Sequence, residues 1–311
     1  MADVRNFRSS YLEKVGIKGI EEKKSLEIIL KEQPIDLEKL SQFCLRFTIP
    51  SAYRNLVWKI LLGVLPTCTE AQEFVWQQRQ AQFDDLTAVT TLLRRNEAQT
   101  EVQEVQHLRM MLLEQNLLPI NPDGMLEEKE NQHFLAMSRT MDGLCEELPA
   151  EIFWMSRNFF LLQKTSAMTP SAAVDLVKAW LQREETDAGA LRTHLESMKG
   201  FQLLPFQMWF NSCYADILPL SSIERIWDKV IAGSQGILVA VAVAVLLTFR
   251  RPVLSLCGIE DVKRYLQLIP EDTGDIIVGE ALKIYHKQSG LLGRSRGGSP
   301  IDKASQNVPL R

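Results

Sequence analysis

The sequence predicts an all-α fold, organised as a single multi-helix domain. Apolar residues recur at the three- and four-residue spacing of amphipathic helices, and no segment shows the alternation of a half-buried strand. Proline, glycine and capping residues separate the helical stretches by short connections. The 311 residues are 46% hydrophobic and 24% charged, which suits a globular chain with a large core.

Start and stop signals define the helices in the first part of the chain. Asp36 can cap one helix and Ser51 the next, which Gly63 can end in the left-handed conformation that glycine adopts easily. Thr67 and Glu70 have the spacing of a capping box, which would open a long helix. The expected helices span residues 21–31, 37–47, 52–62, 68–95 and 99–118.

The second part of the chain follows a turn-rich segment at residues 119–124. Pro149 suits the first turn of a helix, and Ser221 with Glu224 forms a second capping box. The run 237–249 is apolar on all sides but spans only about 20 Å as a helix, too short for a bilayer, so we expect a buried core helix. The expected helices span residues 134–144, 149–163, 174–182, 191–198, 205–217, a stretch opened by Ser221, 237–249, 262–268 and 276–287.

Composition divides the chain into three parts. We expect an N-terminal extension at residues 1–19, one all-α domain at residues 20–287, and a disordered tail at residues 288–311, where Gly, Ser, Arg and Pro predominate. The net charge of −4 gives no reason to expect nucleic-acid binding. The five cysteines include no CxxC pair and the N-terminus has no signal-peptide core, which is typical of a cytoplasmic chain with reduced thiols.

No motif indicates a metal, a cofactor or a self-contained catalytic site. The four histidines lie far apart in sequence, and none sits beside a cysteine or forms a helical i, i+4 metal pair. The chain has no GxxxxGK[ST] phosphate loop, no GxGxxG motif after a strand and no GxSxG elbow. We therefore expect no cofactor, no metal and no hydrolase, transferase or redox chemistry of its own.

Three ordered motifs carry the strongest functional signal. In the first, an arginine and a tryptophan four residues apart share a helix face, and a glycine ends the helix. The second is a Phe-Trp pair in a later helix. The third joins a helix, a proline stop, a second helix and a glycine exit. The motif residues are Arg54, Trp58, Gly63, Trp154, Trp209, Pro219, Trp227, Asp228 and Gly233.

In order and spacing, these motifs resemble the TBC domain, the helical domain of Rab GTPase-activating proteins. The resemblance implies an all-α TBC domain whose signature core covers residues 50–233. Active members of the family supply two residues to the GTPase, an arginine in I-x-x-D-x-x-R and a glutamine in Y-x-Q-G. The arginine neutralises charge on the transferring phosphoryl group, which in well-studied GTPases is worth on the order of 10³–10⁵ in rate, and the glutamine positions the attacking water.

Neither finger pattern occurs at the expected place in this sequence. The best register puts Leu108 and Met111 at the Asp and Arg positions of the first pattern. It puts Glu128 at the Tyr position and Glu130 at the Gln position of the second. A carboxylate repels a phosphate oxygen where a guanidinium would bind it.

Three nearby polar residues would serve as fingers only in a shifted register, namely Arg109, Gln115 and Gln132. A functional side chain must be placed to within about 0.5 Å, which argues against such a shift. The alternatives left open are a Rab GTPase-activating protein with these non-standard fingers and a TBC fold that binds a Rab without stimulating hydrolysis.

The double absence, with stretches 6–9, 19–28, 227–230 and 237–249, resembles the branch of the TBC family found in the tuberous sclerosis complex. This resemblance implies a non-catalytic scaffold that binds the C-terminal coiled coil of hamartin and stabilises the hamartin–tuberin complex. It would thereby support GTP hydrolysis on Rheb and restraint of mTOR complex 1 signalling. It also implies a cytoplasmic protein that its partners recruit to lysosomal or vesicle membranes, without direct membrane insertion.

The long helix expected at residues 68–95 is the candidate docking surface for that coiled coil. Most of its apolar residues fall within one arc of about 120°, at 100° per residue, which we expect to face the core. A second apolar shoulder would suit a partner seam of 3.5-residue period. The alternative is that its aromatic residues fill a cleft under a neighbouring helix. The predicted partner-binding residues are Trp76, Phe83, Leu86 and Thr90.

Overall fold

The structure is a computed structural model that describes residues 20–93, 102–119, 124–145, 148–184, 188–267 and 269–295. Every regular element in these ranges is a helix, which confirms the predicted all-α fold. The first helices are α2 (Ile20–Lys31), α3 (Leu37–Arg46), α4 (Ser51–Leu61), α5 (Thr69–Leu93), α6 (Gln103–Glu114), the 3₁₀ turn η1 (Met125–Glu127), α7 (Lys129–Leu144) and α8 (Pro149–Lys164).

A second series of helices completes the molecule. These are α9 (Pro170–Arg183), α10 (Ala188–Ser197), α11 (Gly200–Leu203), α12 (Phe206–Asn211), α13 (Leu220–Ile231), α14 (Gly236–Thr248), α15 (Arg250–Ser255), α16 (Ile259–Leu266) and α17 (Glu271–Ser295). Helix α17 therefore runs past residue 288, where we expected the disordered tail to begin. The expected N-terminal extension, with the stretch 6–9, and residues 296–311 lie outside the described residues.

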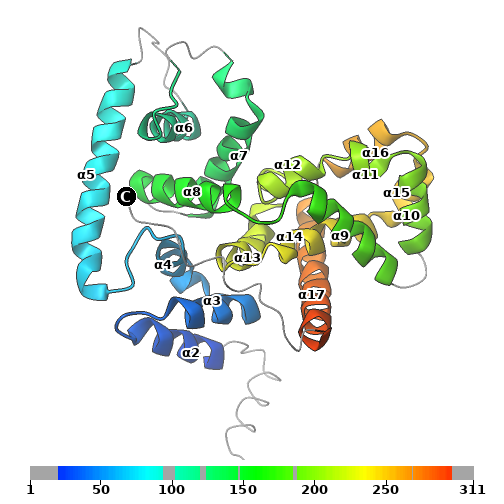
Figure 1. Cartoon of the computed structure of the whole chain (residues 1–311), viewed down its shortest axis with the longest axis horizontal. Helices are drawn as coiled ribbons and strands as arrows, with labels where there is room; N and C mark the ends of the chain where they lie inside the picture. Colours follow the sequence, from blue (N-terminus) through cyan, green and yellow to red (C-terminus); the bar gives the residue numbers. More distant parts are fainter. Residues whose placement is uncertain are drawn as a thin grey trace, which may run out of the picture.

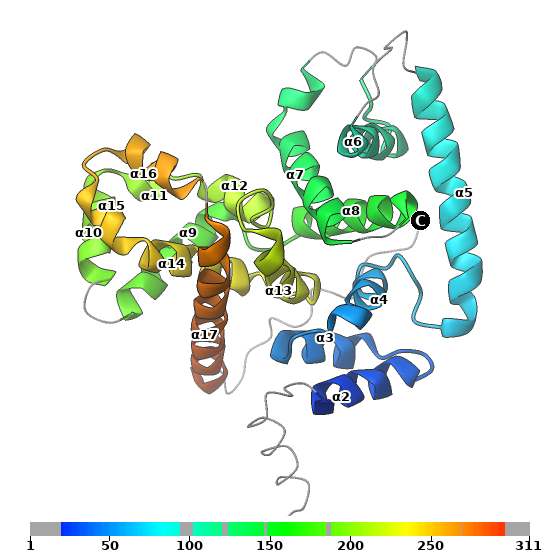
Figure 2. The ribbon, with the colours of Figure 1, turned by 180° about the vertical axis from the view of Figure 1, so that it is seen from behind.

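The two series of helices lie side by side and meet at α13. Figures 1 and 2 show α2 to α8 on one side of the molecule and α9 to α17 on the other. Helix α13 contacts α3, α4 and α7 from the first series and α14 and α17 from the second. Helix α5 runs along the outer edge, where it packs on α6 and α8. The fold thus places α13 at the junction and leaves one long side of α5 exposed.

The apolar helix α14 forms the centre of the second series. Its residues from Ile237 to Leu246 are fully buried, and it packs against α17, α9 and α13. A helix that is apolar on every side needs neighbours on every side, which these contacts provide. The prediction of a buried core helix over residues 237–249 is therefore confirmed.

Several of the predicted local signals are present. The Asp36 side chain accepts hydrogen bonds from the backbone N–H groups of Glu38 and Lys39, as expected for an N-cap. Gly63 and Gly233 have φ angles of 68° and 98°, in the region that favours glycine, and each follows the end of a helix.

Three predicted caps are wrong. Helix α4 begins at Ser51 itself, with Pro50 as the N-cap. Helix α5 begins at Thr69, whose N–H donates to the Gln33 side chain at 3.1 Å in place of the box expected from Thr67. Helix α13 follows Pro219, and the Ser221 hydroxyl donates to Glu271 of α17 instead of capping its own helix. In each case a tertiary contact or a proline replaces the local cap.

The helix predicted over residues 205–217 ends at Asn211. Cys213, Tyr214 and Asp216 have positive φ angles of 50°, 63° and 58°, so the chain turns there in the left-handed conformation. Tertiary contacts stabilise this turn, because Trp227 donates through Nε1 to the Cys213 carbonyl at 2.9 Å and the Tyr214 hydroxyl donates to the Leu238 carbonyl at 3.1 Å. The turn fixes the position of α13 after α12.

Candidate functional site

A buried polar cluster joins α4 to α13. Asp228 accepts from Arg54 Nε at 3.1 Å and from Trp58 Nε1 at 2.9 Å, both through Oδ1. Arg54 also donates to Glu224 Oε2 at 2.6 Å and to the Ile49 carbonyl at 2.9 Å. Asp228 is almost fully buried, so these hydrogen bonds replace its hydration. The structure thus brings together three of the predicted motif residues, two from α4 and one that follows 170 or more residues later in α13.

Burial raises the pKa of Asp228 to about 6, against the opposing effects of the Arg54 charge and the Trp58 hydrogen bond. The carboxyl group is therefore mostly ionised at pH 7, the form that accepts hydrogen bonds from two donors. The donors of Arg54 and Trp58 are used within the protein, in hydrogen bonds to Asp228. We therefore infer that this cluster has a structural role and holds α13 against α4.

The neighbouring Lys229 connects α13 to the end of α3. Its Nζ is buried and donates to the carbonyls of Cys44 and of Phe47, the latter at 2.7 Å. Burial lowers the pKa of Lys229, and the adjacent Asp228 opposes that shift. The two carbonyls near the end of α3 complement the ammonium, as the negative end of a helix dipole does.

Two tryptophans of the predicted motifs lie at this junction. Trp227 packs on Trp58 and Phe159, with ring centroids 6.1 and 4.8 Å away. Trp154 lies apart from them and donates through Nε1 to the Arg79 carbonyl of α5 at 3.0 Å. Trp209 packs edge-on against Phe206 at 5.3 Å. The tryptophans therefore fix how α4, α5, α8, α12 and α13 pack together.

The positions aligned with the arginine-finger pattern lie in the core. Leu108 and Met111 of α6 are 0% and 2% exposed. Glu128 is the N-cap residue of α7 and is exposed. Glu130 is also exposed and forms an ion pair with Lys164 at the end of α8. The residues aligned with the arginine pattern therefore lie inside the protein, and those aligned with the glutamine pattern lie at its surface.

The three residues that would serve as fingers in a shifted register lie on α6, just after α6 and on α7. Arg109 and Gln115 are half-buried on or next to the C-terminal part of α6. The Gln132 side-chain amide donates to the Leu126 carbonyl, which ties it to η1.

Beside the aligned positions on α6, His107 is buried in an aromatic setting. Its Nδ1 lies 3.0 Å from the Ser138 hydroxyl of α7, and its ring contacts those of Phe83 and Phe153. Burial lowers the pKa of His107 to about 4, with a smaller opposing effect from Glu104. The imidazole is thus neutral at pH 7 and belongs to the packing between α5, α6, α7 and α8.

The residues predicted to bind a coiled coil are on the inward side of α5, which corrects their assignment to an outward face. Phe83 contacts His107 and Phe153, and Thr90 is 1% exposed with its hydroxyl bonded to the Leu86 carbonyl. Trp76 and Leu86 are half-buried and pack against the core. Both sides of α5 carry apolar residues, so its periodicity did not determine which side faces inward. The contacts of Phe83 favour the alternative, in which it fills a cleft beside neighbouring helices.

The exposed apolar residues of α5 lie in the arc that we expected to face the core. They gather mainly at its C-terminal end, where Leu92 is 82% exposed and Leu93 53% exposed. Val89 lies one turn earlier and Phe74 near the N-terminal end, 42% and 64% exposed. We call Phe74, Val89, Leu92 and Leu93 the α5 outer stripe.

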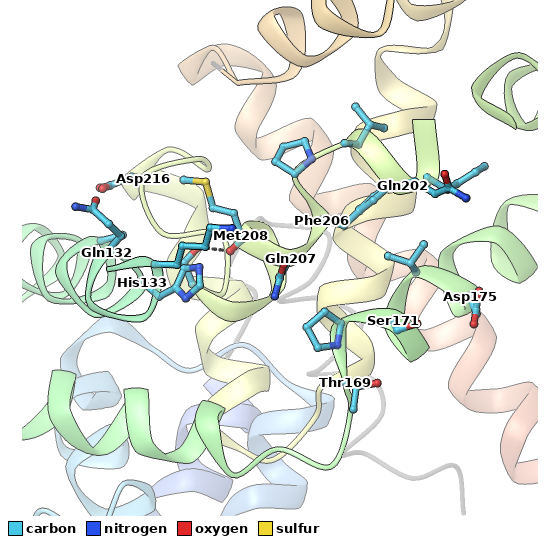
Figure 3. Close-up of a pocket in the computed structure, with 18 of the residues that line it drawn as sticks. Gln132, His133, Thr169, Ser171, Asp175, Gln202, Phe206, Gln207, Met208 and Asp216 are labelled. Atoms are coloured by element: carbon cyan, nitrogen blue, oxygen red, sulfur yellow. Dashed lines mark hydrogen bonds between the residues drawn. The ribbon is translucent and has the colours of Figure 1, made fainter. Parts of the chain in front are cut away.

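A cavity of about 930 Å³ opens between α7, α9, α11 and α12 (Figure 3). Gln132 and His133 of α7, Thr169 and Ser171 at the start of α9, and Phe206 to Met208 of α12 line it. An adjoining cavity of about 420 Å³ shares Lys129, His133, Thr169, Pro170 and Gln207 with the first. Sequence analysis missed these cavities, because their walls come from segments far apart along the chain and follow no motif.

The described residues contain no group of three or more His, Cys, Asp or Glu side chains arranged to hold a metal ion. None of their helices combines the length and the hydropathy needed to cross a membrane.

Comparison with known proteins identifies close relatives. The chain is 41% identical over 286 residues to human (Homo sapiens) TBC1 domain family member 7, covering 92% of this chain and 96% of the relative. It is 40% identical to the Danio rerio protein of that name over 288 residues, and 38% identical to the Xenopus tropicalis protein over 291. These two alignments cover 92% and 94% of this chain and 96% and 98% of the relatives.

The fold and a family profile agree with these relatives. The structure matches the Ypt/Rab-GAP domain of Gyp1p with a TM-score of 0.56 at 16% identity, covering 86% of this chain and 99% of that domain. It matches the Chlamydomonas flagellar RabGAP TBC domain with a TM-score of 0.50 at 12% identity, covering 86% and 94%. A profile of the RabGAP TBC domain matches residues 170–272. The chain therefore belongs to the RabGAP TBC domain family, in the group represented by TBC1 domain family member 7.

Proposed function

We propose that this protein is a non-catalytic TBC-domain scaffold in a complex that controls a small GTPase. In this proposal it binds the C-terminal coiled coil of hamartin, stabilises the hamartin–tuberin complex, and so supports Rheb GTP hydrolysis and restraint of mTOR complex 1 signalling. It acts in the cytoplasm, and its partners recruit it to lysosomal or vesicle membranes.

The observation that carries the proposal is the packing of α6. In the best register of the family pattern, Leu108 and Met111 stand at the Asp and Arg positions, and both side chains lie in the core. An arginine finger must project from the surface to reach a phosphoryl group on another protein. A buried leucine and methionine instead contribute to the stability of the domain.

The α5 outer stripe is the surface that we propose for docking the coiled coil. Helix α5 lies at the edge of the molecule (Figure 1). Its outer stripe exposes Val89, Leu92 and Leu93 near the C-terminal end and Phe74 near the N-terminal end. An amphipathic partner helix buries such a stripe by laying its own apolar seam along it. We therefore assign coiled-coil binding to the outer stripe in place of Trp76, Phe83, Leu86 and Thr90.

Two measurements test the function. Single-turnover GTP hydrolysis by a panel of Rab proteins and by Rheb should be unchanged when this protein is added. Co-purification with the hamartin coiled coil should give a stable complex. Acceleration that disappears with Arg109→Ala would overturn the proposal in favour of a GTPase-activating protein with a shifted finger register.

A matched pair of variants tests the docking surface. Leu92→Glu with Val89→Glu should weaken coiled-coil binding by at least about tenfold, or about 1.4 kcal/mol, because two charges would enter an apolar seam. Ile276→Glu, on an exposed isoleucine of α17, is the control and should bind like the wild type. Equal binding by all three proteins would exclude the outer stripe as the docking surface.

A further inference from the structure

Helix α5 exposes one continuous face along the edge of the molecule (Figures 1 and 2). The residues of this face follow one another at alternating spacings of four and three, and every one of them is exposed. At about 1.5 Å per residue the face is about 27 Å long, or about five turns of a partner helix. We call it the α5 heptad face, and its members are Phe74, Gln78, Ala81, Asp85, Ala88 and Leu92.

The buried side of α5 has the same period. Trp76, Phe83 and Thr90 lie seven residues apart, and all three pack inward. An ideal helix drifts by only about 20° per heptad from this repeat, so its outward face keeps nearly one direction. A partner helix can therefore follow the heptad face along its whole length.

The heptad face is large at its ends and flat in its middle. Phe74 and Leu92 project at the ends, where their side chains are 64% and 82% exposed. Ala81 and Ala88 lie between them, and each carries only a methyl group. In knobs-into-holes packing, large residues of the opposite helix fill such positions. We therefore expect Leu, Met or an aromatic residue of the partner opposite each alanine.

The exposed charges of α5 are all negative. The only basic residue within Thr69–Leu93 is Arg79, which is half-buried with its guanidinium 4.6 Å from the Trp154 ring centroid. None of the carboxylates forms an ion pair with another described residue. An unpaired acidic surface of this kind attracts a basic partner. The carboxylates are Glu70, Glu73, Asp84 and Asp85.

Helix α17 has the same length as α5 but carries charges of both signs. Its Lys283 pairs with Glu280 at 3.0 Å, and its Lys287 pairs with Glu184 after α9 at 2.9 Å. The imbalance of charge is therefore a property of α5 and does not extend over every long helix of the molecule.

Asp85 is the carboxylate that lies on the heptad face itself. Asp84 accepts a hydrogen bond from Gln80, and Glu73 accepts one from Gln77, whereas Asp85 has no polar partner among the described residues. A partner helix that covered Asp85 would remove its hydration, which is costly unless a cation of the partner replaces the water.

We propose that the α5 heptad face selects a partner helix with a Lys or Arg opposite Asp85 and a large apolar side chain opposite Ala81 and Ala88. This inference rests on the coiled-coil docking proposed above and adds the register and the chemistry of the partner. A second copy of α5 does not fit. Two such faces paired along their length, in either direction, bring the two Asp85 carboxylates within about one helical turn of each other.

A displayed library of helical peptides tests the chemistry without any natural partner. The peptides are about four heptads long, with Leu or Ala at the seam positions and Lys or Glu at one seam position and its flanks. Selection on the wild-type protein should enrich Leu and Lys, and selection on Asp85→Lys should exchange one enriched Lys for Glu. Enrichment of Glu on the wild type, the same consensus on both proteins, or no enrichment would overturn the proposal.

The coiled coil of hamartin is the second probe, with affinities measured by fluorescence anisotropy. Asp85→Lys should weaken its binding about tenfold or more through charge repulsion, and Ala81→Trp should do so by keeping the two helices apart. The matched controls are Glu38→Lys on α3 and Ala190→Trp on α10. Both positions are exposed, so these variants should bind within about twofold of the wild type.

Three outcomes separate this proposal from the docking surface on which it rests. Weak binding by Leu92→Glu with Val89→Glu, but wild-type binding by Asp85→Lys and Ala81→Trp, would overturn the proposal and keep the outer stripe. The predicted peptide consensus without any binding of hamartin would support the proposal and overturn hamartin as the partner. A dimer of the chain alone in sedimentation velocity, dissociated by Leu92→Glu, would assign the face to a second copy and overturn the proposal.

Discussion

The α4–α13 junction and helix α6 differ in the chemistry of their buried residues. At the junction, Arg54, Trp58 and Asp228 meet through hydrogen bonds between residues 170 or more apart in sequence. On α6, the aligned positions hold Leu108 and Met111, which are packed in the core. Polar residues that hold the helices together are present, whereas the residues aligned with the finger pattern are apolar. The buried polar residues thus stabilise the α4–α13 junction, and Leu108 and Met111 contribute apolar packing to α6.

The largest predicted effect comes from placing the Asp and Arg of the family pattern on α6. Leu108→Asp with Met111→Arg should lower the free energy of unfolding by at least about 5 kcal/mol, because both charges would enter a buried site without partners. Urea denaturation measures the loss, and single-turnover hydrolysis with Rab proteins should show no acceleration. Leu108→Met with Met111→Leu is the volume-conserving control, at a cost under about 1.5 kcal/mol. A stable double variant that accelerates hydrolysis would mean that α6 presents these positions to a GTPase.

Removal of the acceptor at the junction should have the next largest effect. Asp228→Ala leaves the buried Arg54 guanidinium and Trp58 N–H without their shared partner, so we expect a loss of about 3–5 kcal/mol. Chemical denaturation measures it. Asp84→Ala, which removes an exposed carboxylate bonded only to Gln80 in the described structure, should change stability by no more than about 0.5 kcal/mol. Similar values for the two variants would show that the cluster does not stabilise the junction.

The smallest predicted effect is on the pH dependence of stability. His107 of α6 and Asp228 of the junction contribute to it with opposite signs. Burial holds the pKa of His107 at about 4, below its ordinary value of 6.5. Below pH 6.5 the unfolded chain therefore binds more protons at this site, and stability falls as the pH drops towards 4. The raised pKa of Asp228, about 6, has the opposite sign between pH 6 and 3.8, where the folded state binds more protons.

His107→Gln isolates the histidine contribution. The difference in unfolding free energy between wild type and variant should decrease by up to about 3 kcal/mol from pH 7 to pH 4, at about 1.4 kcal/mol per pKa unit. Urea titrations at intervals across this range measure it. Parallel pH profiles for the two proteins would show that His107 titrates normally in the folded state.

Sequence reasoning predicted the parts of the fold that depend on local patterns. The buried helix α14 and the signals at Asp36 and Gly63 follow from residues close together in the chain. Tertiary contacts decided the rest. The turn at Cys213 and Tyr214 depends on Trp227 and Leu238, which no local propensity could reveal.

The candidate surfaces were harder to predict for the same reason. Helix α5 is apolar on two sides, and its contacts with Phe153 and His107 select which side is buried. Without those distant residues, the periodicity of α5 is equally compatible with either orientation. The cavity of about 930 Å³ depends entirely on how α7, α9, α11 and α12 come together.

The hydrogen bonds of Lys229 indicate which segments of the chain α13 needs in order to stay folded. Its ammonium takes its acceptors from Cys44 and Phe47, which precede the signature core that the sequence predicts at residues 50–233. The helices that bury α13 on its other side, α14 and α17, come after that core. A splice form or gene fusion that kept the signature alone would leave a buried cation without acceptors and expose the apolar faces of α13. Recombination that keeps α13 folded must therefore keep α3, α14 and α17 with it.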